Sequence, residues 1–395
     1  MPDRERGTAP VAPPEAYPSS ALPAQQQVVV PAIDFDRWAR FIVRELFDTQ
    51  PHEAYLLMGD PYYWPELIDA LRAEFMEARA VELGTILFDG PRAWKRRQSL
   101  WPRDTDVNYK RLETAAMRRL YERADIFLWL PGRTDNFRQE RSDRRLFEHL
   151  VEGSSARGLH MHWIQGPDRF SQQDLEALGA IYEAALDIDY AALSAHQDRI
   201  IAAIKGQKVH ITTPSGTDLT FYVPENAWFH KNDGRLDRHK AARARSVRDR
   251  QMELPAGALR FIPDVTKVDG VLAVPSFYGA SNVRFSFENG LVVSVIAEQN
   301  EEKMLAAWAD ETGDKDRLAE VVIGTNPKLP DRGPGLGDWP PYYGYGDGIL
   351  RIALGENWES GGTNRSSMEA WFYFIDATIS AGDTLIVKDG ELVVR

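Results

Sequence analysis

The stretch Ile126-Phe-Leu-Trp-Leu130, followed directly by Pro131-Gly132, is the clearest indication of the fold in this sequence. An apolar run that ends at two turn-forming residues is typical of a strand buried on both faces of a sheet. Similar short runs occupy residues 54–58, 85–88 and 159–164. Segments with apolar residues at helical spacing alternate with these runs, at 35–46, 66–80, 112–123 and 175–185, the last behind a capping box at Ser171 and Asp174. This alternation predicts an α/β first domain with a mostly parallel sheet.

The pattern changes near Lys205-Gly206, where we place a domain boundary. Beyond it the chain has short β-rich runs at 208–213, 219–223, 270–274, 283–287 and 291–296. Asn289-Gly290 lies between the last two and is a hairpin signal, and residues 384–394 repeat the hairpin pattern. The sequence therefore predicts three parts, which are a disordered tail rich in Pro, Ala and Gln at 1–32, an α/β domain at 33–205, and a β-rich α+β domain at 206–395.

The composition excludes several classes of site. The 395 residues include no cysteine, which rules out disulfides, thiolate metal sites and a cysteine nucleophile. A net charge of −12 argues against general nucleic-acid binding, and no stretch approaches the roughly 20 apolar residues that cross a bilayer. The first residues lack the apolar core of a secretion signal, so we expect a cytoplasmic protein that binds neither nucleic acid nor membrane. A basic run from Arg235 to Arg250 is either a solvated face or a contact for an anionic partner or substrate.

Five short motifs follow one another in the second domain. They are Gly216-Thr-Asp-Leu219, Glu253-Leu-Pro-Ala-Gly257, Leu318-Ala-Glu320-Val-Val-Ile-Gly324-Thr-Asn326, Arg351-Ile-Ala-Leu-Gly355 and Gly361-Gly-Thr-Asn364-Arg-Ser366. In their order and spacing they resemble the aminopeptidase T (leucyl aminopeptidase) family of metallopeptidases, whereas the first domain agrees with that family only in its general pattern. The resemblance implies an aminopeptidase T-like fold, a cleft between the two domains, and a homodimer.

In that family these motifs hold two divalent metals, which activate a water for attack on a peptide carbonyl. The two glutamates that bind metal in the family match Ala258, after Pro-x-Gly, and Glu320. The family's ligand His matches Arg351, and its catalytic Tyr matches Trp358. Its final His-x-Asp pair matches Glu369 and Trp371. Glu320 is thus kept, and Glu369 is a possible carboxylate substitute. The resemblance therefore implies a divergent member of the family. We expect it to have no cofactor, or else a divalent metal held in part by Glu320 and Glu369.

Arg351 changes the chemistry of this region because a guanidinium does not deprotonate to bind a metal. It either pairs with Glu320 or Glu369, or binds the carboxylate or phosphate of a substrate through two parallel hydrogen bonds. A Gly- and Pro-rich loop just before it carries Tyr343 and Tyr345. These two rings, together with Trp358 and Trp371, are candidate substrate contacts, although such a loop can also pack onto its own domain or onto a dimer partner.

From the resemblance we expect a divergent aminopeptidase-like protein that acts on or binds a peptide-like or amino-acid-like small molecule without the two metals. The catalytic candidates are Glu320 as acid or base, Arg351 as anion anchor and Glu369 as a second carboxylate. Three alternatives stay open. The chain is a metal-dependent aminopeptidase with substitute ligands, a non-catalytic binding protein, or a ring-cleaving enzyme with mononuclear iron, like other relatives on the same fold.

Overall fold

A computed structural model of the chain describes residues 34–59, 64–87, 115, 118–130, 155–161, 171–337 and 340–394. The predicted tail at 1–32 lies outside these residues, as does most of the first half of the predicted helix at 112–123. Within the described ranges no helix is long and apolar enough to span a bilayer.

Sheet A is parallel throughout and contains the strand that the sequence marked most clearly. Its order is β2-β1-β3-β4-β8, formed by β1 (Ala54–Gly59), β2 (Val81–Leu87), β3 (Ile126–Leu130), β4 (Arg157–Met161) and β8 (Gln251–Leu254). The first four match the predicted apolar runs, because a strand covered on both faces needs apolar residues at nearly every position. The mostly parallel α/β part of the prediction is therefore confirmed.

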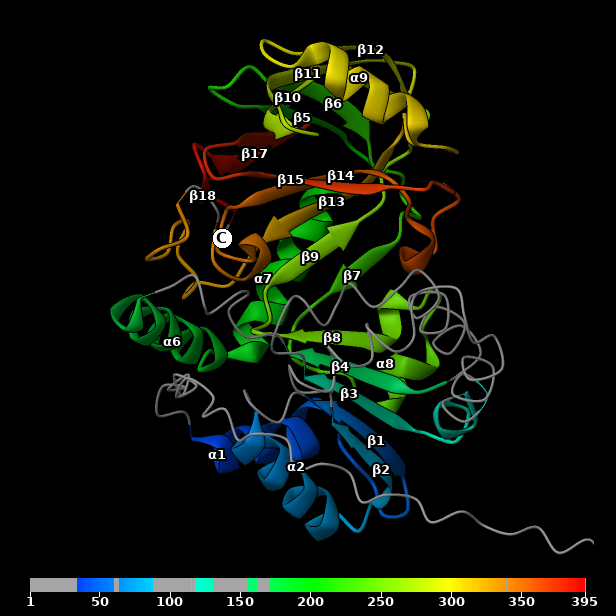
Figure 1. Ribbon diagram of the computed structural model, residues 1–395, viewed down its shortest axis with the longest axis vertical. Helices are drawn as coiled ribbons and strands as arrows, with labels where there is room; N and C mark the ends of the chain where they lie inside the picture. The colour runs from blue at the N-terminus through cyan, green and yellow to red at the C-terminus, as the bar shows by residue number, and fades with distance from the viewer. Residues whose placement is uncertain are drawn as a thin grey trace, which may run out of the picture.

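Helices cover sheet A and share its apolar core. They are α1 (Phe35–Arg40), continued as a π-helix η1 (Phe41–Leu46), α2 (Pro65–Glu77), and α6 (Gln172–Leu186). Trp38, Ile42 and Phe75 pack against Leu57 and Leu128 of the sheet in one apolar cluster. The predicted capping box is formed at the start of α6, where Ser171 accepts a hydrogen bond from the Asp174 backbone N–H. In Figure 1 this part of the molecule lies at the bottom.

Sheet B is the large antiparallel sheet at the top of Figure 1. Its order is β12-β11-β10-β6-β5-β16-β17-β18, formed by β5 (Lys208–Thr212), β6 (Asp218–Tyr222), β10 (Val268–Phe277), β11 (Ala280–Glu288), β12 (Leu291–Ile296), β16 (Thr378–Ala381), β17 (Thr384–Lys388) and β18 (Glu391–Leu392). Both predicted hairpins are present. Asn289 and Gly290 have positive φ angles of 50° and 84°, as the tight turn between β11 and β12 requires.

Sheet C lies between the other two sheets (Figure 1). Its order is β15-β14-β13-β9-β7, formed by β7 (Phe229–Lys231), β9 (Ala258–Phe261), β13 (Leu318–Gly324), β14 (Leu350–Gly355) and β15 (Glu369–Phe374). Every residue of β9, β13 and β14 is buried, since one face of the sheet packs on sheet B and the other faces sheet A. The apolar face shares a core with sheet B through residues such as Phe261, Val321 and Ile352.

Two elements connect the halves of the chain. The helix α7 (Tyr190–Ile204) precedes the predicted boundary, yet its Ile200 and Ile204 belong to the core of sheets B and C. Conversely, β8 follows the boundary and pairs in parallel with β4 in sheet A. The remaining described elements are α8 (Arg238–Ala242), η4 (Arg248–Arg250), α9 (Glu301–Asp310), η5 (Tyr342–Gly344) and η6 (Trp358–Ser360).

Candidate functional site

The face of sheet C that turns away from sheet B carries the predicted site residues. Val322 of β13 lies opposite Arg260 of β9 on one side and Arg351 of β14 on the other. Two residues along the strands, Glu320 of β13 lies opposite Ala353 of β14. Ala353 in turn lies opposite Trp371 of β15. Directly opposed residues, and residues two apart along a strand, share one face of a sheet. The register therefore places Arg260, Arg351, Glu320 and Trp371 on the same face.

Arg351 lies in a cage of aromatic rings and is only 4% exposed. Its guanidinium carbon is 4.3 Å from the ring centre of Trp371, 5.0 Å from that of Tyr373, 5.3 Å from that of Tyr345 and 5.8 Å from that of Tyr343. Such rings attract a cation through their negative faces but accept no strong hydrogen bond. Nε and Nη1 of Arg351 accordingly have no hydrogen-bond partner among the described residues. Buried donors without a hydrogen-bond partner are uncommon, so these two nitrogens are available to a further acceptor.

Two tyrosines of the cage, Tyr343 and Tyr345, come from a strained segment, whereas Tyr373 belongs to β15. Tyr342 and Tyr343 have φ angles of 44° and 55°, which non-glycine residues seldom adopt, and they form the short helix η5. The segment is fixed to the end of β13, because the backbone N–H groups of Thr325 and Asn326 both donate to the Tyr345 carbonyl, at 3.0 and 2.9 Å. This anchoring holds Tyr345 over the guanidinium groups of both Arg351 and Arg260, 5.3 and 5.6 Å from its ring centre.

Arg260 is the main residue of this site that the sequence did not single out. Its Nη2 donates to Glu253 Oε2 at 2.7 Å and to the Tyr345 hydroxyl at 2.5 Å, and that hydroxyl in turn donates to Glu253 Oε2 at 2.6 Å. Because Glu253 belongs to β8 of sheet A, this network joins sheets A and C. The sequence feature that could have indicated Arg260 is its position as the one charge in the apolar stretch 258–262. A charge in a buried strand has to be paired, so such a residue marks a buried polar network.

The electrostatics keep this network ionised at neutral pH. Burial alone would raise the pKa of Glu253, but the charges of Arg260 and Arg248 and the Tyr345 hydrogen bond hold it well below its usual range. Burial alone would lower the pKa of Arg260, yet the surrounding Tyr345, Glu253 and Glu320 raise it. Burial lowers the pKa of His160 to about 4 and that of His230 well below normal, so both rings are neutral here.

Glu320 is 2% exposed and is held in place from one side only. Ser360 donates a short hydrogen bond to Oε1. The backbone before Glu320 is fixed by Asn357, whose Nδ2 donates to the Ala319 carbonyl at 3.0 Å, and by Asn364, whose Nδ2 donates to the Leu318 carbonyl at 3.1 Å. Among the described residues Oε2 has no hydrogen-bond donor, and its one ion-pair contact there is with Arg260 Nη1 at 3.5 Å.

The structure separates the predicted site residues into two groups. Arg351, Glu320, Trp371, Tyr343 and Tyr345 converge on the same face of sheet C, as described above. Of the two roles left open for Arg351, the ion pair with Glu320 or Glu369 is not formed. Glu320 pairs with Arg260, and Glu369 accepts a hydrogen bond from Trp371.

The remaining two predicted residues lie at the margin of this face. Glu369, at the exposed start of β15, accepts a hydrogen bond from Trp371 Nε1 at 3.0 Å. Trp358 is half-buried, its backbone N–H donates to Glu356 Oε1, and its ring makes no contact with the cage among the described residues.

The donor set does not fit the dinuclear metal centre that the resemblance implies. Within the described ranges, no three His, Asp or Glu side chains converge in a way that could hold a metal ion. Around Glu320 the neighbouring charges are guanidinium groups, which cannot ligate a cation.

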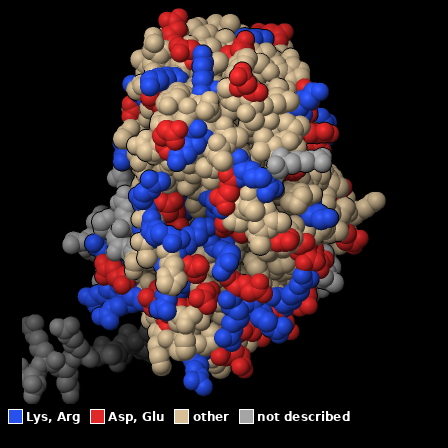
Figure 2. Space-filling view, turned by 180° about the vertical axis from the view of Figure 1, so that it is seen from behind, with Lys and Arg blue, Asp and Glu red and all other residues tan. Residues whose placement is uncertain are grey.

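The basic run borders the site through one residue. Arg248 Nη2 binds Glu359 Oε2 at 2.6 Å, next to Ser360, while Lys240 and Arg238 pair with Asp233 and Glu53. The face of the molecule shown in Figure 2 carries groups of Lys and Arg side chains around its middle and below, mixed with Asp and Glu. Arg248 is thus a structural neighbour of the site.

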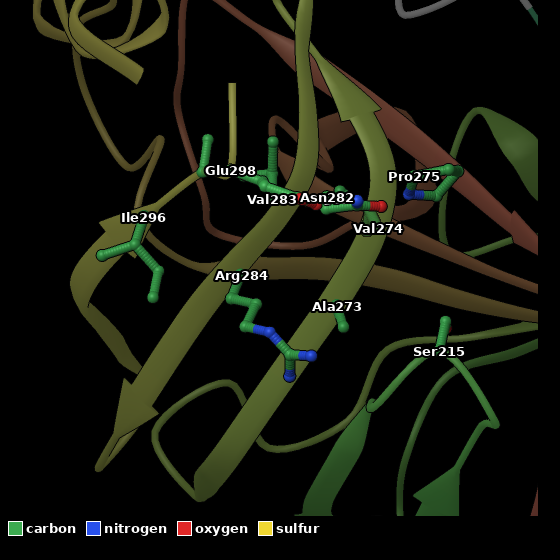
Figure 3. Close-up of a pocket in the computed structure, with 10 residues that line it drawn as sticks. Ser215, Ala273, Val274, Pro275, Asn282, Val283, Arg284, Ile296 and Glu298 are labelled. Carbon is green, nitrogen blue, oxygen red and sulfur yellow. Dashed lines mark hydrogen bonds between the residues drawn. The ribbon is translucent and has the colours of Figure 1, made fainter. Parts of the chain in front are cut away.

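A separate pocket of about 570 Å³ lies on sheet B. It is formed by β10 and β11 with the loop of Ser215, and none of the predicted site residues lines it. In Figure 3 the Arg284 side chain reaches toward the Ser215 loop, where it donates to the Gly216 carbonyl at 3.4 Å. Its polar lining residues are exposed and hydrogen-bonded, so this pocket lacks the unpartnered buried donors of the Arg351 cage.

Comparison with known proteins identifies the fold. No family model and no curated protein matches the sequence. Among solved structures, the chain is similar to wild-type AmpT (aminopeptidase T) from Thermus thermophilus, with a TM-score of 0.62 and 16% identity over 91% of this chain and 99% of that one. It is also similar to 2,5-dihydroxypyridine dioxygenase from Pseudomonas putida KT2440, with a TM-score of 0.59 and 14% identity over 91% of this chain and 97% of that one. The chain thus has an aminopeptidase T-like fold.

Proposed function

We propose that this protein binds a small carboxylate-bearing molecule, amino-acid-like or peptide-like, at Arg351 between sheets A and C, without a dinuclear metal centre. The observation that supports the proposal is the cage itself. It holds a guanidinium that is 4% exposed, surrounds it with four rings, and leaves Nε and Nη1 without partners among the described residues. A carboxylate accepts two parallel hydrogen bonds from such a planar group.

The charge of Arg351 also favours an anionic ligand. A buried charge without a counter-ion is costly, and the described residues give Arg351 no acidic partner. The rings around it contribute cation–π attraction and flat apolar surfaces against which the rest of a small ligand can pack. In this proposal Glu320 is the nearby acid or base and Glu369 a second carboxylate at the rim.

The test compares ligands that differ only in the carboxylate. Calorimetric titration should show binding of L-leucine and 4-methylpentanoate, and of L-phenylalanine and 3-phenylpropanoate, but weak or no binding of the matching amides. Replacing Arg351 by Met should weaken carboxylate binding about tenfold to a hundredfold, which corresponds to about 1.5–3 kcal/mol for a charged hydrogen bond. Arg351→Lys should recover only part of the loss, since an ammonium lacks the planar fork.

A matched control is Arg284→Met, which removes an arginine from the pocket on sheet B and should leave all affinities unchanged. The proposal is wrong if acids and amides bind equally, or if none of the acids binds. Metal analysis that finds two tightly held divalent ions per chain would also contradict it, as would release of N-terminal residues from short peptides after addition of cobalt, manganese or zinc.

A further inference from the structure

Among the described residues of the site, the positive and negative charges are equal in number, but they are not all paired with one another. Arg248 forms an ion pair with Glu359 at the partly exposed edge of the site, and its charge also acts on Glu253 and Glu320. Arg260 lies between two carboxylates, those of Glu253 and Glu320, so this group carries one negative charge in excess. Arg351 has no acidic partner in the described part of the chain and carries the matching positive charge. The site therefore has a positive end at Arg351 and a negative end at the Arg260 group.

The acceptor left without a hydrogen bond at the negative end is one oxygen of Glu320. Arg260 directs its hydrogen-bonding Nη2 to Glu253 and Tyr345, at 2.7 and 2.5 Å, and meets Glu320 only at 3.5 Å. Glu320 Oε1 is used by Ser360, whereas Oε2 is buried and accepts no hydrogen bond from any described residue. Oε2 is thus a free acceptor with negative charge on the same face of sheet C as the free donors of Arg351.

The two ends lie within reach of one small molecule. Val322 separates Arg260 from Arg351, and Glu320 is two residues from Val322 on the same strand. Glu320 and Arg351 are therefore diagonal neighbours on adjacent strands, for which Cβ atoms are typically about 7–8 Å apart. Trp371 lies over both guanidinium groups, 4.3 Å from that of Arg351 and 5.8 Å from that of Arg260, and so covers both ends of the site.

We infer that Glu320 is a cation subsite, and that the ligand is a zwitterion whose ammonium binds Glu320 Oε2 while its carboxylate binds Arg351. This inference rests on the proposed function and adds the second pole of the ligand. A carboxylate alone would leave a buried excess of negative charge, whereas a zwitterion leaves the site as balanced as it was. An ammonium needs only one carboxylate, while a metal ion would need several ligands that the described residues do not bring together.

The experiment deletes the amine of the ligand and the charge of Glu320 separately. In the wild-type protein, L-leucine should bind about tenfold to a hundredfold more tightly than 4-methylpentanoate, which lacks only the amine. L-Phenylalanine and 3-phenylpropanoate form a second such pair. In Glu320→Gln, the two members of each pair should bind with nearly equal affinity, and the affinity for the amine-free acid should stay the same or rise, because one buried negative charge has been removed.

The outcomes distinguish the two proposals. If neither acids nor amino acids bind, the proposed function fails. If 4-methylpentanoate binds as tightly as L-leucine to the wild-type protein, carboxylate binding stands and the cation subsite is refuted. The cation subsite is likewise refuted if Glu320→Gln weakens both ligands equally, as a purely structural Glu320 would. The ligand comparison in the wild-type protein needs no variant, so poor folding of Glu320→Gln would not prevent a decision.

Discussion

At the scale of single residues, Glu253 is the clearest case of a charge whose ionisation stabilises the fold. Its pKa in the folded protein is held well below the usual 4.5 of a free carboxyl by Arg260, Arg248 and Tyr345, against the effect of burial. Because the pKa of Glu253 is lower in the folded than in the unfolded protein, its ionised carboxylate stabilises the fold fully at pH values above the unfolded pKa. This stabilisation is then lost as the pH falls from about 4.5 toward the folded value.

We predict that Glu253→Gln lowers the free energy of unfolding at pH 7 by about 3–5 kcal/mol, because it leaves Arg260 with a weaker partner in a buried site. Below pH 4.5 the wild-type protein should lose stability faster than the variant, so the difference between them should shrink. Urea titrations at several pH values measure both effects. The exposed Glu302→Gln is the control and should follow the wild type; a constant difference at all pH values would contradict the assignment.

At the scale of elements, the contact of β13 with the segment that follows η5 positions the aromatic cage. A Cβ atom on Gly324, at the end of β13, would lie 2.0 Å from the Gly346 carbonyl oxygen and 2.8 Å from the Tyr345 carbonyl carbon. Any side chain there must push this segment away from the sheet. The rings of Tyr343 and Tyr345 would then move relative to Arg351 and Arg260.

We predict that Gly324→Ala costs about 1–3 kcal/mol of stability, the usual range for inserting a methyl group where there is no room. The same change should weaken carboxylate binding, since Tyr345 no longer holds Arg260 and Glu253. Thermal unfolding and the calorimetric titrations measure the two effects. Gly84→Ala in β2 is the matched control, because its Cβ would meet nothing closer than Leu56 Cδ1 at 3.9 Å. Equal behaviour of the two variants would contradict this role of Gly324.

At the scale of the whole molecule, the two halves of the chain exchange elements. Residues Met252 and Leu254 of β8 complete the core of sheet A, and α7 delivers Ile200 and Ile204 to the core of the other sheets. Gln197 of α7 also donates to the Thr325 hydroxyl at 2.9 Å. Neither half, cut at the predicted boundary, would therefore keep a complete core.

We predict that a fragment of residues 34–205 does not fold alone, because it leaves the β4 edge and the apolar face of α7 uncovered. Produced together, the fragments 34–205 and 206–394 should associate and recover the circular dichroism spectrum of the intact chain. A cooperative thermal transition of the first fragment by itself would show that the boundary near residue 205 separates independent domains.

The sequence by itself determined the local elements of this protein. Apolar runs such as residues 126–130 form parallel strands, and Asn289-Gly290 forms a hairpin turn. Both follow from the spacing of apolar residues and from turn-forming residues, which act over a few neighbouring positions. It also proposed Glu320 and Arg351 as candidate site residues, through motifs read position by position.

Only the tertiary structure decided which charges meet. The partners of Glu253 are 7 and 92 residues away, and Glu320 is bonded to Ser360, 40 residues away. Such pairs depend on the register and stacking of whole sheets, which no local pattern encodes. For this reason the sequence left open whether Arg351 pairs with Glu320 or Glu369 or binds a substrate anion. The register places Arg260 beside Glu320 and leaves Arg351 among aromatic rings, with two donors that have no partner among the described residues.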